Sequence, residues 1–194
     1  MSTLSALNER IISAASRMGV TVNKIQQALD CPGFEMEDRM VAIILEYAEI
    51  TSGVYTPLGA EKTGLVPMGC RIQTDSPEGS LDSARFDFSS RPVLEGERCV
   101  TGRAALHAAV SSPQVVGSLG LAAKLLMAQR HGKEIFPKES QGCYFLLPRT
   151  VLIDPGTYEC FPVFEYKRVS ELWAVNFFLV DDLIGSDARF IRLA

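Results

Sequence analysis

The sequence lacks the features by which membrane and secreted proteins are usually recognised. No stretch approaches about 18 consecutive apolar residues, the length that a membrane-spanning helix requires. The chain begins without the basic and apolar regions of a secretory leader. Its five cysteines are odd in number, widely spaced and without a Cys-x-x-Cys pair. We therefore expect reduced thiols and a cytoplasmic protein that makes no contact with a membrane.

Motifs for metals, phosphates and cofactors are also missing. The two histidines, His107 and His131, cannot join the cysteines in a metal site at any usual spacing. The glycine-containing stretches TSGVYTPLGAEKTG and VVGSLGLAAK lack the Gly-Lys-Ser/Thr ending of a phosphate-binding loop. We expect neither a metal site nor a cofactor.

Positive charge is scarce in this chain. It carries 19 Lys and Arg against 23 Asp and Glu, a net charge of −4. Residues 1–52 hold four basic and seven acidic side chains, residues 53–140 ten and nine, and residues 141–194 five and seven. No segment forms a basic patch, which argues against binding driven mainly by phosphate charge. With 47% hydrophobic and 22% charged residues, the composition is that of a globular protein.

The apolar mass of the chain is concentrated in residues 143–180. Alternation and turn residues predict strands over 143–153, 158–166 and 171–180, which would pair as an antiparallel meander. Neither face of the third strand is polar, with Leu172, Ala174, Phe178 and Val180 on one face and Trp173, Val175, Phe177 and Leu179 on the other. We expect both faces to be covered.

Helical patterns precede this meander, and one further strand follows it. Residues 102–111 and 113–131 have helical spacing. In the second helix Ser112 is the expected N-cap and Gly132 the expected stop. This helix is the best candidate to cover one face of the meander. Residues 188–193 predict a last short strand.

The N-terminal part differs from the rest in its hydrophobic spacing and its content of turn residues. Residues 5–18, 22–29 and 35–50 have the apolar spacing of three helices that would form a small bundle. Residues 53–101 are rich in turn residues and predict loops around two brief strands, over 65–74 and 84–88. We therefore expect an α+β protein: a helical region over 1–52, then an α+β domain over 53–194 with a loop-rich part (53–101), helices (102–131) and the β-meander with its last strand (143–193).

Small and aliphatic residues near the N-terminus have the spacing of a DNA-binding motif. In IISAASRMGVTVNKIQQALD these are Ala15, Gly19, Val20 and Ile25. Alanine lets two helices cross closely, glycine permits a tight turn, and the aliphatic residues hold the pair together. The segment Ile11–Asp30 thus resembles the helix-turn-helix family of DNA-binding proteins. The same spacing also fits a plain helical hairpin, so both interpretations stay open.

The resemblance implies a nucleic-acid-binding face on the second helix. Amide side chains on such a helix can pair with the edges of adenine. The implied base-facing residues are Val22, Asn23, Gln26 and Gln27, with Arg17 and Lys24 as phosphate contacts. On this basis we predict a non-enzymatic regulatory protein of the bacterial or phage kind that binds a macromolecule, DNA or protein. The family resemblance also implies a homodimer.

Two other functions fit the sequence. An acidic, loop-rich protein can act as an inhibitor or adaptor that occupies a partner protein, in particular one whose own site is basic, such as a nucleic-acid-binding protein. A cysteine-dependent hydrolase is the third, because QGCYF around Cys143 partly matches the Gln-Ala-Cys signature of caspase-like proteases. The residues that follow Cys143 depart from that signature, and a cysteine at the start of a buried strand is usually a small hydrophobic residue.

Overall fold

The computed structural model describes residues 46–92 and 98–194. The chain divides into two compact units, Met1–Ser52 and Gly53–Ala194, and each is considered by itself. In the first unit, residues 46–52 are described and helical. The helices expected over 5–18 and 22–29, and most of the third, lie outside the described residues.

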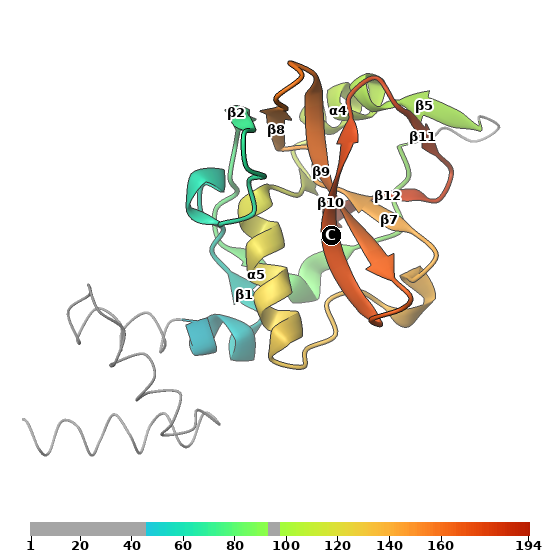
Figure 1. The fold of residues 1–194 in the computed structure, drawn as a ribbon. Coiled ribbons are helices and arrows are strands. Elements are labelled where there is room, and N and C mark those ends of the chain that lie inside the picture. The colour runs from blue at the N-terminus through green and yellow to red at the C-terminus, as the bar shows by residue number, and fades with distance from the viewer. Residues whose placement is uncertain (1–45, 93–97) are drawn as a thin grey trace, which may run out of the picture. The chain divides into compact units, whose positions relative to one another are not determined.

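The second unit is built mainly from short strands (Figure 1). Its two α-helices are α4 (Gly102–Val110) and α5 (Leu119–Arg130), and three single turns of 3-10 helix are η1 (Ala60–Lys62), η2 (Ser83–Arg85) and η3 (Lys138–Ser140). The strands are β1 (Val54–Tyr55), β2 (Arg71–Asp75), β3 (Leu81–Asp82), β4 (Phe86–Asp87), β5 (Cys99–Thr101), β6 (Val115–Val116), β7 (Tyr144–Leu146), β8 (Thr150–Ile153), β9 (Glu159–Lys167), β10 (Leu172–Leu179), β11 (Leu183–Gly185) and β12 (Ala188–Leu193).

This architecture corrects the expected fold class. The described residues form twelve strands in three sheets and only three α-helical segments, so they are mostly β, and they contain no N-terminal helical bundle. The expected meander is not a separate unit, because its strands belong to a sheet of eight. The missed strands, β1, β3, β5, β6 and β11, are two or three residues long and pair with partners far away in sequence, so local alternation could not reveal them.

The central strand of the large sheet is β9. One of its edges pairs antiparallel with β10 along the whole length, from Leu172 opposite Lys167 to Leu179 opposite Cys160. Its other edge is shared by β8 and β7, which form one strand broken at 147–149. Beyond β8 lies β2, while β12 runs parallel to β7 and then continues between β6 and β4. The sheet therefore splits around the break, with β2 at one end and β4 at the other.

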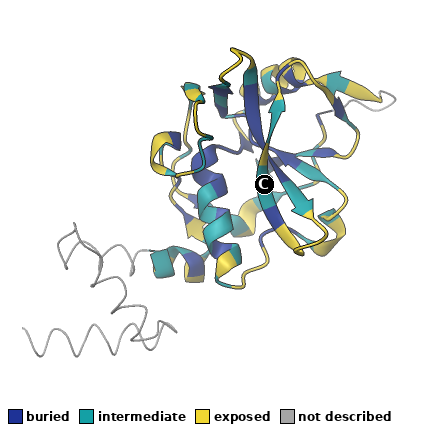
Figure 2. Cartoon of the chain, in the orientation of Figure 1, coloured by how far each residue is buried: buried dark blue, intermediate teal, exposed yellow. Residues whose placement is uncertain are grey.

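Each face of the sheet has its own hydrophobic core (Figure 2). On one face α5 packs over Phe145, Phe164 and Trp173. On the other face the buried alanines of α4 pack with Leu146, Phe161, Val163, Val180, Ile184 and Phe190. The alternation in β9 explains this division, because its odd-numbered and even-numbered side chains point to opposite faces.

Helix α5 begins six residues later than the sequence predicts. Val115 and Val116, two β-branched residues, form β6 against β12, and Gly117 follows with a φ of +135°. The N-cap is Ser118, whose hydroxyl accepts from the N–H of Leu121 at 3.1 Å. Ser112 and Pro113 therefore do not start this helix. Its end is as expected, with Gly132 in the left-handed region at a φ of +79°.

Helix α5 also packs so closely against the segment before η1 that position 120 requires glycine. A Cβ on Gly120 would lie 1.9 Å from the carbonyl oxygen of Leu58. This close packing fixes the segment before η1 against the helix. Among the described helices, none combines the length and the apolar character that crossing a membrane requires.

Candidate binding groove

The residues that the sequence proposed for DNA contact lie outside the described part of the chain. They are Arg17, Val22, Asn23, Lys24, Gln26 and Gln27. The structure therefore neither brings them together nor separates them, and the helix-turn-helix resemblance stays a prediction. The candidate site within the described residues is formed by other segments.

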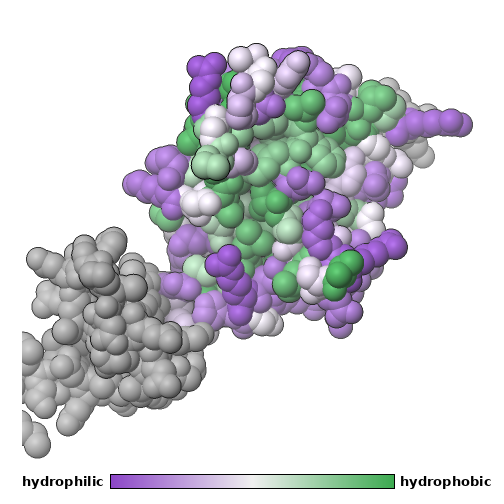
Figure 3. Space-filling model, viewed as in Figure 1, coloured by the Kyte–Doolittle hydropathy of each residue, from purple (hydrophilic) through white to green (hydrophobic). Residues whose placement is uncertain are grey.

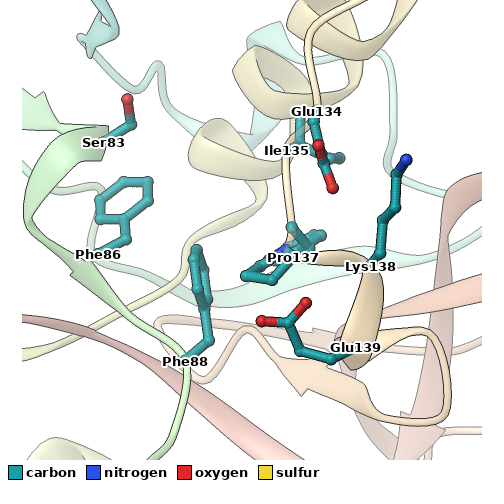
Figure 4. Close-up of a pocket in the computed structure, with 9 residues that line it drawn as sticks. Ser83, Phe86, Phe88, Glu134, Ile135, Pro137, Lys138 and Glu139 are labelled. Atoms are coloured by element: carbon teal, nitrogen blue, oxygen red, sulfur yellow. The ribbon is translucent and has the colours of Figure 1, made fainter.

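A groove of about 620 Å³ lies between β4 and residues 134–139. Ser83, Phe86 and Phe88 line one side, and residues 134–139 line the other (Figure 4). We call it the aromatic groove. Its volume is within the range of about 300–1,000 Å³ that ligand sites usually have.

Packed aromatic rings form the floor of this groove. The Phe88 ring lies edge-on to Phe136 and Phe145, with centroids 5.3 and 5.5 Å away. Phe136 and Phe145 stack in parallel at 4.2 Å, and Phe136 continues the cluster to Trp173 at 4.6 Å. Rings at these separations attract one another beyond simple burial. The half-buried Phe88 is thus held rigidly from below while part of it faces the groove.

Local hydrogen bonds set the β4 side of the groove. The carboxylate of Asp82 caps η2 by accepting from the N–H of Ala84 at 2.9 Å. The guanidinium of Arg85 donates to the carbonyl oxygen of Ala194 at 2.8 Å. Strand β4 then pairs with the end of β12. These contacts attach the wall to the C-terminal strand.

The opposite wall follows directly from the end of α5. After Gly132, the N–H of Lys133 bonds back to the carbonyl of Ala128, and the buried side chains of Ile135 and Phe136 anchor the segment in the core. The turn η3 closes it. The anchors leave the intervening polar residues on the surface, where Glu134, Lys138 and Glu139 are exposed.

These three exposed residues give the groove its charge, two negative and one positive. In Figure 4 the side chains of Glu134 and Glu139 lie on either side of Pro137, and the carboxylate of Glu139 points toward Phe88. Lys138 extends along the side away from Phe86 and Phe88. Over the described ranges 46–92 and 98–194, neither glutamate has a hydrogen-bond or ion-pair partner within the chain. Both carboxylates are therefore available to a ligand.

Beyond the 134–139 segment lies a second, smaller hollow of about 270 Å³. Gln129, Tyr166, Glu171 and Trp173 contribute to its lining. Trp173 is only 6% exposed, so the aromatic cluster presents little surface here. This hollow lies next to the aromatic groove but exposes no comparable aromatic surface.

The most polar cluster in the interior has a structural role. The carboxylate of Glu78 accepts from the N–H of Gly117 and the hydroxyl of Ser118, both at 2.5 Å, at the start of α5. Thr150 accepts from the N–H of Leu119 and donates to Asp75. Every buried side-chain polar atom in the described ranges has a partner. These side chains accept from the N–H groups of Gly117, Leu119 and Leu121 and so satisfy most of the helix N-terminus.

Apolar surface also gathers around the strip between α5 and β10, where Figure 3 shows hydrophobic side chains framed by hydrophilic ones. Leu172 and Leu179 of β10 are 49% and 39% exposed, and Val175 and Phe177 are partly buried. This surface offers burial but no group that would select a ligand.

Cys143 and the two histidines lie on different elements of the described ranges. Cys143 makes a backbone hydrogen bond to Ser140 just before β7, while His107 lies on α4 and His131 caps the end of α5. Burial raises the pKa of the Cys160 thiol to about 11, so that this thiol stays protonated at neutral pH. In the same ranges no cluster of three metal-ligating side chains occurs.

The aromatic groove could not be predicted from the sequence. Its two walls are separated by about 50 residues in the chain, and only tertiary pairing brings them together. One local signal was present: Phe86 and Phe88 alternate with Asp87 in a segment otherwise rich in turn residues. In comparisons with family models, curated proteins and solved structures, no match to the chain was found.

Proposed function

We propose that this is a non-enzymatic docking protein that binds a basic segment of another protein in the aromatic groove. The observation that carries the proposal is the pair of unpartnered carboxylates, Glu134 and Glu139, beside an open aromatic surface. The interpretation corresponds to the acidic inhibitor or adaptor considered from the sequence. A helix-turn-helix role for residues 11–30 remains a prediction from the sequence.

The chemistry of the groove favours a cationic side chain over an anionic one. A Lys or Arg side chain can lay its apolar stem along Phe86 and Phe88 while its charge reaches a carboxylate. An anionic group would meet two negative charges and one positive charge, that of Lys138, which extends along the side away from Phe86 and Phe88. The overall charge of −4 adds a weaker, longer-range attraction for a basic partner and speeds its association.

The proposal is tested by site-specific photo-crosslinking in extracts of the native host. A photoreactive amino acid replaces Ser83 in the groove, and in a second protein it replaces Ser170 in the turn after β9. We expect a protein adduct from position 83 that is lost in the Glu134→Lys and Glu139→Lys variants. The matched control Glu61→Lys, which changes an exposed charge on η1, should retain it.

Two results would overturn the proposal. One is an adduct that persists at equal yield in both charge-reversal variants. The other is an adduct of the same protein, in the same amount, from position 170.

A further inference from the structure

We propose that the partner segment binds as an extended strand, parallel to β4, with a Lys or Arg side chain held at Glu134 and Glu139. This inference rests on the proposed docking function and adds the conformation, the direction and the key side chain of the bound segment. It follows from the backbone groups that β4 leaves open and from the charges beside them.

The register of β4 shows which of its backbone groups face outward. The N–H of Ala194 donates to the carbonyl oxygen of Arg85 at 2.8 Å, and Asp87 lies opposite Arg192. Because backbone direction alternates along a strand, Asp87 faces β12 while Phe86 faces the outer edge. The same alternation, continued one residue past the end of β4, turns the backbone of Phe88 to the outer edge. This edge is one end of the sheet order.

Two of the outward groups are available. The N–H of Phe86 already donates to the carbonyl oxygen of Ser83 within η2. The carbonyl oxygen of Phe86 and the N–H of Phe88 have no hydrogen-bond partner in the part of the chain that the structure describes. Unpaired backbone groups of this kind are the usual template for strand addition.

A further exposed edge of the sheet, at β10, is partly closed by side chains of the protein itself. Val180 donates to Glu159, so the register turns the N–H groups of Trp173, Val175, Phe177 and Leu179 outward. Those of Trp173, Phe177 and Leu179 have side-chain acceptors. Their acceptors are the side chains of Gln129 at 2.8 Å, Asn176 at 2.9 Å and Asp182 at 3.2 Å. The protein thus caps three of the four outward N–H groups of β10 with its own side chains, whereas no side chain caps the Phe88 N–H in the described residues.

The two open groups of β4 match the hydrogen bonds of a single residue in a parallel partner strand. In a parallel pair, one residue bonds to the two residues that flank its neighbour, accepting from one and donating to the other. A partner residue opposite Asp87 would donate to the Phe86 carbonyl and accept from the Phe88 N–H. An antiparallel strand would bond at both Phe86 and Phe88, and the carbonyl of its residue opposite Phe86 would find that N–H already used within η2. We therefore choose the parallel direction.

The same register places the cation. Side chains alternate across a sheet, so the partner residues before and after the bonded one lie on the face of Phe86 and Phe88. The later of the two lies beside Phe88, toward which the Glu139 carboxylate points (Figure 4). We therefore place Lys or Arg immediately after the residue that bonds to β4.

The test uses the full chain and a fluorescent nine-residue peptide of alternating Thr and Val in which one central Val is replaced by Arg. Two matched peptides carry Glu in place of Arg, or N-methylate the backbone of the Thr before the Arg. We expect the parent to bind at least about tenfold more tightly than either matched peptide, which corresponds to about 1.4 kcal/mol.

Hydrogen exchange supplies a readout that side-chain docking alone would not change. The Phe88 amide should exchange at least about tenfold more slowly when the parent peptide is bound, because strand pairing protects it. The Val169 amide, in the exposed turn between β9 and β10, serves as the control and should not change.

Equal affinity of the parent and N-methylated peptides, an unprotected Phe88 amide, or no binding of the parent at about 1 mM would each overturn the inference. Strand addition would then fail while docking could still stand, because the crosslink from position 83 tests docking independently of the conformation of the partner.

Discussion

The side-chain amide of Gln129 pairs with both backbone groups of Trp173. Its oxygen accepts from the Trp173 N–H at 2.8 Å, and its nitrogen donates to the Trp173 carbonyl oxygen at 3.0 Å. The amide thereby takes the place of one residue of a neighbouring strand. It also connects the last turn of α5 to the outer edge of β10, beside the ring cluster that forms the floor of the aromatic groove.

Replacing Gln129 with Ala should lower the free energy of unfolding by about 1–2 kcal/mol, because two backbone hydrogen bonds are lost at a partly buried position. Urea denaturation at pH 7 measures the change. Gln141→Ala, which removes an exposed amide side chain, should have little effect. Equal stability of Gln129→Ala and the native protein would show that water replaces the amide without cost.

Gly120→Ala should destabilise the protein, although alanine is the better helix former. The added Cβ would overlap the Leu58 carbonyl, which lies 1.9 Å from its position. We expect a loss of at least about 2 kcal/mol, since α5 must shift from its contact. The matched variant Gly142→Ala, with nothing within 4 Å of the added Cβ, should stay within about 0.5 kcal/mol of the native protein. A neutral Gly120→Ala would contradict the packing of α5.

Glu78→Ala should destabilise α5 specifically at its N-terminus. The Glu78 side chain is 5% exposed and supplies the acceptor for Gly117 and Ser118. Its removal leaves buried donors unpaired, which we expect to cost about 1–3 kcal/mol. Thermal unfolding followed by circular dichroism measures this, with Glu139→Ala as the exposed control. Equal melting temperatures of Glu78→Ala and the native protein would show that Glu78 does not stabilise the N-terminus of α5.

The buried thiol of Cys160 should make the protein less stable in alkaline solution. Burial is the main cause that raises its pKa from 9.0 to about 11, so the native state keeps the proton while the unfolded chain loses it. Stability from this group is complete below pH 9 and falls as the pH rises toward 11. Between pH 9 and 11, the decrease in the free energy of unfolding should be roughly 2–3 kcal/mol smaller in Cys160→Ala than in the native protein. Parallel stability curves for the two proteins between pH 9 and 11 would contradict this.

Local patterns predicted those elements whose stability is decided by nearby residues. The alternation over 158–166 and 171–180 marks β9 and β10, and the stop at Gly132 marks the end of α5. The predicted start of α5, at residue 113, was wrong because Val115 and Val116 pair with β12, a partner about 75 residues away. Tertiary pairing there overrides the helical spacing.

The site depends even more on long-range contacts. Neither Phe86 nor Glu139 carries a signal of function by itself, since an alternating Phe pair and an exposed carboxylate are common. Their meaning comes from the pairing of β4 with β12 and from the anchoring of Ile135 and Phe136. The sequence instead predicted a DNA-binding segment at residues 11–30, which lie outside the described ranges, and offered Cys143 as a candidate nucleophile.

The most direct measurement of the central claim is the affinity of the arginine-containing peptide for the native protein and for Glu134→Gln/Glu139→Gln, which keeps the shape of both side chains and removes their charge. We expect unchanged melting temperatures, because both side chains are exposed and unpartnered within the described chain, and an affinity at least about tenfold weaker in the double variant at low salt. Glu61→Gln should bind as the native protein does. Equal affinity of the native protein and the double variant would contradict the assignment of the aromatic groove as a site for a basic segment.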